Sequence, residues 1–232
     1  MKFTKSLIKG KLVKRYKRFF ADIKLNEETI IAHCPNTGSM MGLLDEENEV
    51  FVSKNDDPKR KLKYTLEIIK VKKNLVGVNT HFANKIAFHG LSNNLVKEVK
   101  NSNNIKPEVF FDKETRFDFL VEKDNQKTFV EVKNVTLSRK DKLAEFPDAV
   151  TSRGSKHLKT LIEATKKGYK TYLLFLVQIQ GVTDFKIAKD IDKEYYENYK
   201  LAKKAGVKFL AYRCKISSKE IKIEKKIKII ND

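Results

Sequence analysis

The amino-acid sequence predicts an α+β chain of two domains: a small β-barrel over residues 1–80, and an α/β domain with a mixed β-sheet and flanking helices over residues 81–232. The first 80 residues consist of short, alternating apolar and polar segments separated by polar turns, which is typical of strands. From residue 81 onward, segments with helical spacing alternate with apolar strand-like segments. No low-complexity linker separates the two parts, so we expect the domains to pack closely.

The first domain is predicted to hold about five short strands, at residues 17–25, 28–34, 49–55, 62–73 and 75–80. Short strands joined by tight turns in a small basic domain predict a barrel of the oligonucleotide-binding (OB) type.

The segment "CPNTGSMMGLL" separates the second and third of these strands. Pro35, Asn36 and Gly38 favour a turn, while Thr37 and Ser39 place hydroxyl groups beside exposed backbone amides. Such a loop can hold a phosphate group. An ordinary turn is the alternative interpretation.

The second domain is predicted to begin with two helical segments and then to alternate strands with helices. We expect helices at 81–90 and 91–100, strands at 108–112, 116–123 and 128–135, a helix at 148–168, a buried strand at 169–179, a helix at 192–206, a strand at 207–214, and a charged edge strand or hairpin at 219–229.

The strand "TFVEVKNV" carries Glu131 and Lys133 on one face. If Asp124 and Asn125 form a two-residue hairpin turn, Asp118 lies opposite Glu131 on the preceding strand. Two carboxylates this close repel each other, and a divalent cation such as Mg²⁺ or Mn²⁺ would reverse that penalty. Lys133 would then orient an attacking water molecule. An acid followed by Glu-x-Lys on the next strand is typical of the PD-(D/E)xK nuclease-like fold.

Further side chains are candidates for the same site. An upstream helical acid often completes it, and Glu98 is the candidate. On the helix after the strands, Arg153, His157 and Thr160 share one face and are suited to hold a phosphate group. A surface histidine is the alternative for His157.

Charge favours a polyanionic partner. The net charge is +19, with 17 basic and 10 acidic residues up to residue 80, and 32 basic and 20 acidic residues after it. Both domains are therefore positive, as expected if a nucleic acid crosses both. A general lysine bias of the proteome is the alternative, because Lys greatly outnumbers Arg. A membrane-surface protein is disfavoured, because the charge is dispersed among strand patterns.

The chain is predicted to be a cytoplasmic protein. No apolar run approaches the roughly 20 residues of a membrane span, and the first 20 residues contain no uninterrupted apolar segment typical of a secretory signal. Cys34 and Cys214 form no Cys-x-x-Cys pattern, which predicts reduced thiols.

Several segments resemble, in order, the sugar fermentation stimulation protein family: "RYKRFFAD", "HCPNTGSMMG", "VNTHFANK", "RFDF", "VEVKNVTL" and "FPDAVTSRGSKHLKTL". The resemblance implies an N-terminal OB-fold, a C-terminal nuclease-like domain, DNA binding and a regulatory role in sugar utilisation. It also implies that certain residues matter, in the first domain His33, Asn36, Thr37 and Gly38, and in the second Asp118, Glu131, Lys133, Arg153, Lys156 and His157. Arg15, Lys17 and Arg18 of "RYKRFFAD" are added as candidate nucleic-acid contacts.

Three functions are compatible with the sequence. The first is weakly sequence-specific, electrostatic DNA binding, since no convincing helix-turn-helix pair is present. The second is an Mg²⁺- or Mn²⁺-dependent nuclease acting on DNA or RNA through Asp118, Glu131 and Lys133. The third is an RNA-binding module that uses the OB-like face.

Overall fold

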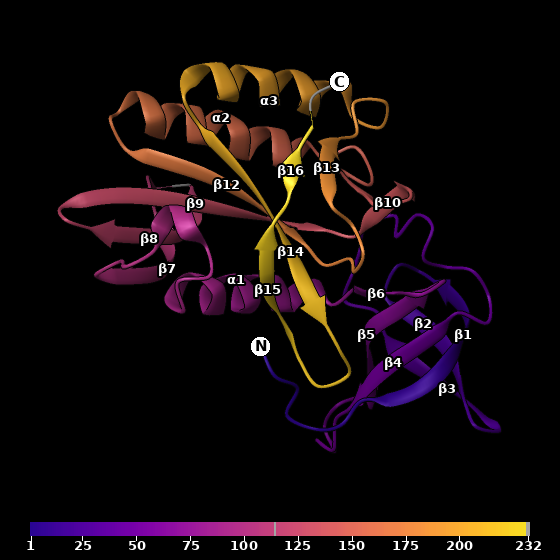
Figure 1. Cartoon of the computed structure of the whole chain (residues 1–232). Coiled ribbons are helices and arrows are strands. Elements are labelled where there is room, and N and C mark those ends of the chain that lie inside the picture. The colour runs from indigo at the N-terminus through magenta and orange to yellow at the C-terminus, as the bar shows by residue number, and fades with distance from the viewer. Residues whose placement is uncertain (114, 231–232) are drawn as a thin grey trace.

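The computed structural model describes residues 1–113 and 115–230. A β-barrel formed by the first part of the chain lies beside a larger domain, in which a twisted sheet separates helix α1 from helices α2 and α3 (Figure 1). In the described ranges, no helix has the length and apolar character needed to cross a membrane.

The barrel is a closed ring of five strands. Its strand order is β3-β2-β1-β4-β5, and a parallel pairing of β3 with β5, at Ala32↔Tyr64 and His33↔Thr65, closes the ring. A sixth strand extends the sheet beyond β5. The strands are β1 (Ile8–Tyr16), β2 (Phe20–Leu25), β3 (Glu28–His33), β4 (Glu49–Lys54), β5 (Tyr64–Val71) and β6 (Asn74–Gly77).

The barrel architecture is confirmed, but one of its strands was not predicted. Strand β1 lies at the centre of the barrel sheet, yet its sequence, "IKGKLVKRY", is mostly lysine and small or branched residues, and only Gly10 and Leu12 are buried. The predicted fifth strand, 75–80, corresponds to β6, which lies outside the ring.

The second domain is built on a six-stranded mixed sheet with the order β15-β14-β12-β9-β8-β7. Strands β9, β12 and β14 are parallel, and antiparallel strands flank them on both sides. The predicted buried strand is confirmed, since β12 is central and "LLFLV" is buried throughout. The strands are β7 (Asn104–Phe110), β8 (Arg116–Lys123), β9 (Gln126–Val135), β12 (Lys170–Val177), β14 (Lys208–Ile216) and β15 (Ile221–Lys226).

A second, small sheet of order β10-β11-β13-β16 was not predicted. Its strands have two to four residues each, too short for alternation to be recognised in the sequence. They are β10 (Leu137–Lys140), β11 (Leu143–Phe146), β13 (Asp184–Ile187) and β16 (Lys228–Ile229).

Local capping determines where the helices begin and end. Thr151 accepts the N–H of Gly154 at the start of α2, and Asp192 accepts the N–H of Tyr195 at the start of α3. Gly206 ends α3 with φ +102°. The helices are η1 (Thr80–Phe82), α1 (Ala83–Ser92), η2 (Lys97–Val99), α2 (Ser152–Lys166) and α3 (Lys193–Ala205).

The prediction of two helical segments interrupted at Gly90 was wrong. Helix α1 continues through Gly90 to Ser92, and residues 93–100 contain only the short 3₁₀ helix η2. Gly90 packs closely against β15, since a Cβ atom there would lie 2.4 Å from the terminal methyl group of Ile223. Asn94, with φ +58°, then turns the chain away from the helix.

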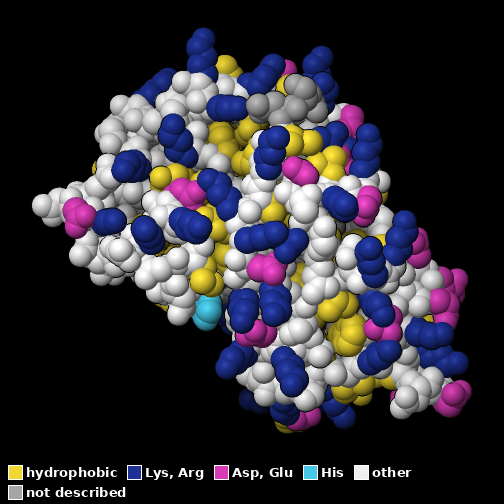
Figure 2. Space-filling view, viewed as in Figure 1, with side chains coloured by type: hydrophobic (Ala, Val, Ile, Leu, Met, Phe, Trp, Pro, Cys, Tyr) yellow, Lys and Arg dark blue, Asp and Glu magenta, His cyan; other side chains and the backbone are white. Residues whose placement is uncertain are grey.

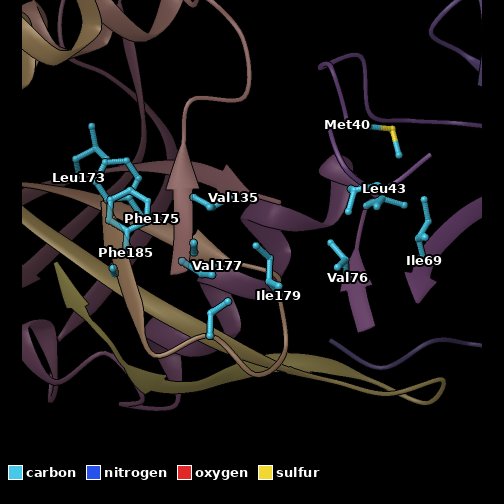
Figure 3. Close-up of a cluster of buried hydrophobic side chains, with 14 of the residues drawn as sticks. Met40, Leu43, Ile69, Val76, Val135, Leu173, Phe175, Val177, Ile179 and Phe185 are labelled. Carbon is cyan, nitrogen blue, oxygen red and sulfur yellow. The ribbon is translucent and has the colours of Figure 1, made fainter. Parts of the chain in front are cut away.

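The two domains share one hydrophobic core. Figure 3 shows Val76 of the barrel beside Ile179 of the second domain, and both belong to one cluster of buried side chains that also contains Met40, Leu43 and Val135. A backbone bridge joins Val76 to Ile179.

The first residues of the chain lie against the second domain rather than the barrel. The Phe3 N–H donates to the Lys219 carbonyl, and Lys2 forms a bridge with Glu220 before β15.

Candidate nucleic-acid and metal site

The hairpin formed by β8 and β9 positions the predicted acids. Asp124 and Asn125 have φ of 47° and 64°, the left-handed values of a two-residue type I′ turn. The register runs from Lys123↔Gln126 to Phe119↔Val130, as the two-residue turn requires. The predicted turn and register are therefore confirmed.

Asp118 lies where the two strands separate. Its Oδ2 accepts the backbone N–H of Val132 at 2.7 Å. The β8–β9 pairing ends at Phe119↔Val130, so the carboxylate takes the place of a β8 carbonyl as the acceptor for this N–H. Its Oδ1 accepts from the side-chain amide of Asn84 in α1 at 2.8 Å. The side chain is thereby fixed at the junction of β8, β9 and α1.

Glu131 is 3% exposed and forms the centre of a polar cluster. Its Oε1 accepts from Lys133 Nζ at 3.0 Å and contacts Nδ1 of His157 from α2. Arg153 Nε donates to His157 Nε2 at 3.3 Å, and Lys133 Nζ lies 3.0 Å from His157 Nδ1. Glu131, Lys133, His157 and Arg153 therefore form one connected polar cluster.

The two carboxylates have opposite pKa shifts. Burial raises the pKa of Asp118, and the nearby negative charge of Glu131 raises it further. Burial also acts to raise the pKa of Glu131, but the hydrogen bond from His157 and the charge of Lys133 outweigh it, so the pKa of Glu131 is lowered. Glu131 is thus held as a carboxylate, whereas the charged form of Asp118 is disfavoured.

A pocket of about 520 Å³ opens beside these acids. Asp118 and Asn84 line it on one side, and the helix α2 supplies Arg153, Lys156 and His157 on the other. The structure therefore brings the predicted phosphate-holding side chains of α2 to the predicted acid. Thr160 is the exception, because it is buried and its hydroxyl donates to the Lys156 carbonyl within the helix.

Glu98 does not take the predicted place. Its carboxylate accepts from the Tyr212 hydroxyl at 2.7 Å and from Lys226 at 2.6 Å, and Tyr212 belongs to the buried cluster on the α1 side of the sheet. Glu108 of β7 lines the pocket instead. The Asn84 side-chain amide, which donates to Asp118, also donates to Glu108 Oε1 at 3.4 Å. No sequence pattern pointed to Glu108, which stands at the first residue of a predicted strand.

The "HCPNTG" loop holds the two domains together. Arg15 Nη2 donates to the carbonyls of Asn36 and Gly38 at 2.8 and 3.1 Å, and Asn36 Oδ1 accepts the Gly38 N–H at 2.9 Å. Across the interface, the Ser39 hydroxyl donates to the Asp148 carbonyl at 2.7 Å. A Cβ atom on Gly38 would lie 2.7 Å from the Asp148 carboxylate, so glycine permits this close approach without moving the Asp148 side chain.

The remaining candidates of the barrel surround this loop. Arg18 and Thr37 line a second pocket of about 500 Å³ between the loop and residues 146–151. Lys17 and Arg18 are exposed at the β1–β2 turn, with φ of 47° and 63°. His33 is half-buried, and its ring centroid lies 6.3 Å from that of His81. Burial and then the charge of Arg60 lower the pKa of His33.

Carboxylate oxygens are the candidate ligands for a hard divalent cation beside this pocket. Among the described residues, no cluster of three or more His, Cys, Asp or Glu side chains has the arrangement of a metal site. Mg²⁺, however, is usually bound through only one or two carboxylates and keeps several waters. Asp118 lines the pocket, and Glu131, 3% exposed and not among the lining residues, is the second carboxylate nearby. Burial is the larger cause of the raised pKa of Asp118, and the charge of Glu131, which a cation would offset, is the smaller one.

Comparisons with known proteins agree with both domains. The model of the SfsA N-terminal OB domain matches residues 13–78, and that of the sugar fermentation stimulation protein RE domain matches residues 81–220. The solved structure of Pyrococcus furiosus SfsA in complex with Ca²⁺ superposes with a TM-score of 0.88 at 24% identity, covering 100% of this chain and 98% of that one. The predicted fold, an OB barrel followed by a nuclease-like domain, is confirmed.

Two relatives extend the match over the whole chain. A sugar fermentation stimulation protein homolog of Pelagibacter ubique (strain HTCC1062) is 84% identical over 231 residues, covering 100% of both chains. A homolog of Marinomonas sp. (strain MWYL1) is 41% identical and covers 99% of this chain and 90% of its own. The chain therefore belongs to the sugar fermentation stimulation protein family.

Proposed function

We propose that the chain binds DNA and that the pocket between α1, α2 and the β7–β8 edge holds a segment of the phosphodiester backbone. The observation that carries this proposal is the convergence of Arg153, Lys156 and His157 on one pocket. Guanidinium and ammonium groups are the usual phosphate ligands of proteins. Regulation of sugar utilisation would be a consequence of such binding at particular genes.

The surface charge supports a sequence-independent mode. Lys and Arg side chains are spread over both domains on the face seen in Figure 2, with fewer Asp and Glu side chains among them. A backbone that crosses both domains would release counterions from each, so log affinity for duplex DNA should fall with log salt by roughly 0.9 per phosphate neutralised.

The test is a salt titration of binding to labelled single-stranded, duplex and branched DNA, with RNA of the same sequence as competitor. Lys156→Ala should weaken binding and reduce the salt slope by about 1. Lys127→Ala is the matched control, because Lys127 is an exposed lysine near the start of β9 that does not line the pocket. Binding that is absent at low salt, or that Lys127→Ala weakens as much as Lys156→Ala, contradicts the proposal.

A second candidate function is metal-dependent cleavage of the phosphodiester bond, which is favoured by the charges of Glu131 and Lys133 near Asp118. A bound Mg²⁺ or Mn²⁺ would supply Lewis acidity toward the phosphate and lower the pKa of a water ligand. Asp118 and Glu131 would hold it. Lys133, 13% exposed and 3.0 Å from Glu131, would orient the water and balance the charge that develops on the phosphate.

Cleavage and binding are separated by variants of the same pocket. Lys133→Ala should abolish cleavage in Mn²⁺ while most of the DNA affinity remains, because phosphate contacts are distributed. Glu131→Gln should do the same. If the wild type leaves all DNA forms and RNA intact in Mg²⁺ and Mn²⁺, binding stands alone and the nuclease function is wrong.

A further inference from the structure

Phe110 lies at the rim of the candidate pocket and is unusually exposed for an aromatic residue. It ends strand β7, its side chain is 65% exposed, and it lines the same pocket as Asp118 and Arg153. Single exposed apolar residues are common on protein surfaces and by themselves need no explanation. A phenyl ring beside a group of phosphate-binding side chains does, because it offers an apolar flat face where a nucleotide would lie.

The ring is held in place by its neighbour across the hairpin. Phe110 pairs with Arg116 of β8, whose guanidinium carbon lies 5.3 Å from the ring centroid. Glu108 in turn pairs with Arg116 at 3.2 Å. A cation–π contact on one face fixes the orientation of the ring and places a positive charge beside it.

We propose that Phe110 is a stacking platform for an unpaired nucleobase whose phosphate lies in the pocket. This inference rests on the proposed function and specifies its substrate class. Stacking of a base on an aromatic side chain contributes about 1–3 kcal/mol per base and tolerates any sequence. The pocket volume of about 520 Å³ falls within the range of small-ligand sites.

The substrate class follows from the geometry of nucleic acids. A base inside an intact duplex is already stacked on both faces, so a protein ring reaches it only after the base has left the stack. Single strands, frayed ends and unpaired junctions expose such bases without that cost. The chain is therefore expected to prefer single-stranded or partly unpaired DNA to intact duplex.

The experiment uses single-stranded and duplex oligonucleotides carrying the fluorescent base 2-aminopurine, with chelator present so that no cleavage occurs. Phe110→Ala should reduce single-strand affinity about 5- to 150-fold, the loss expected for one stacked base, and abolish the quenching of 2-aminopurine by the protein. Duplex affinity should change less than about twofold. Phe110→Tyr keeps an aromatic ring and should restore both readouts, whereas Phe110→Leu should not. Phe19→Ala, 49% exposed on the barrel, is the matched control.

The outcomes distinguish this inference from the proposed function. A wild type that binds no nucleic acid overturns both. If the wild type binds and Phe110→Ala binds single strands equally well, only the stacking platform is wrong. The same conclusion follows if Phe110→Ala loses equal affinity for single strand and duplex, or if Phe110→Leu restores both readouts. Gel filtration compares the oligomeric states of the wild type and Phe110→Ala. If the wild type elutes as an oligomer and Phe110→Ala as a monomer, the ring packs against a second copy of the chain and the proposal is wrong.

Discussion

The ammonium group of Lys133 lies 3.0 Å from Oε1 of Glu131, two residues before it on the same strand. The same spacing occurs at Glu220 and Lys222, which also form an ion pair, at 2.7 Å. The two ion pairs differ in burial, since the Glu131 side chain is 3% exposed and the Glu220 side chain is 27% exposed. An exposed pair of this kind contributes little, whereas a buried carboxylate with two donors is an organised polar site.

Metal binding should stabilise the protein. At a hundredfold excess over Kd, a ligand that binds only the folded state adds about 2.7 kcal/mol, or roughly 5–10 °C in Tm for a chain of this size. Thermal melts with and without Mn²⁺ measure this rise in Tm.

Asp118→Asn should abolish the Mn²⁺-induced rise in Tm. Its metal-free Tm should equal or exceed that of the wild type, because burial and Glu131 already disfavour the charged form of Asp118. Asp141→Asn, on the exposed β10–β11 turn, should shift like the wild type. Equal shifts in wild type and Asp118→Asn would exclude Asp118 as a ligand.

Glu131 should support the fold at neutral pH and not in acid. Its folded-state pKa is lowered, so its contribution is present above the unfolded value of about 4.3 and is lost as pH falls through the folded value. Glu131→Gln should cost on the order of 3 kcal/mol at pH 7, since Lys133 and His157 lose their buried partner. Below about pH 4.5 the Tm of this variant should fall less steeply than that of the wild type.

Urea unfolding and the dependence of Tm on pH test this prediction, with Glu163→Gln on the exposed face of α2 as control. A parallel pH profile in both proteins would show that Glu131 is not linked to stability.

Arg15 should prove to be a structural residue and Lys17 a contact to nucleic acid. The Arg15 guanidinium donates to three backbone carbonyls, including that of Arg18 at 3.1 Å. Arg15→Ala should therefore destabilise the fold by about 1–3 kcal/mol. The exposed Lys17→Ala should leave stability within about 0.5 kcal/mol and reduce the salt slope of DNA binding by about 1. Denaturant unfolding and salt titration of both variants decide the assignment, and the reverse pattern would restore Arg15 as a DNA contact.

Asp148 should stabilise the contact between the domains. Its Oδ2 accepts the Met40 N–H at 3.2 Å and the Ser39 hydroxyl at 3.2 Å. Asp148→Ala leaves the Met40 N–H without this acceptor, at a cost of about 1–3 kcal/mol. Hydrogen exchange of the Met40 amide should accelerate in the variant, while Asp141→Ala should leave it unchanged. Unaltered exchange in Asp148→Ala would show that the loop is held by other contacts.

The parts of the site that follow from local chemistry were predictable. Asp124 and Asn125 tolerate positive φ, so the hairpin register could be derived from the sequence. The predicted pair of Asp118 with Glu131 lies one position beyond the end of the ladder, where the Asp118 carboxylate accepts the Val132 N–H instead. The face of α2 with Arg153 and His157 follows from helical spacing. In both cases the determining residues lie within a few positions of each other.

The parts set by distant contacts were not predictable. Glu98 was assigned to the site from a helix at 91–100 that does not form, and its partner Tyr212 lies 114 residues away. The "HCPNTG" turn was foreseen, but its partner Asp148 is 109 residues away, so the sequence could not show that the loop faces another domain. Glu108 reaches the pocket through the residue's positive φ of 52°, an irregularity in β7 that alternation cannot predict.

The shared core means that this two-domain chain is not modular. Met40, Leu43 and Val76 are at most 4% exposed and belong to one buried cluster with side chains of the second domain. A barrel excised at residue 80, or grafted onto an unrelated partner, would present these side chains to water and should aggregate. Heating the whole chain should accordingly give a single calorimetric transition. In evolutionary terms, the barrel and the nuclease-like sheet must be inherited together, because each supplies part of the interior of the other.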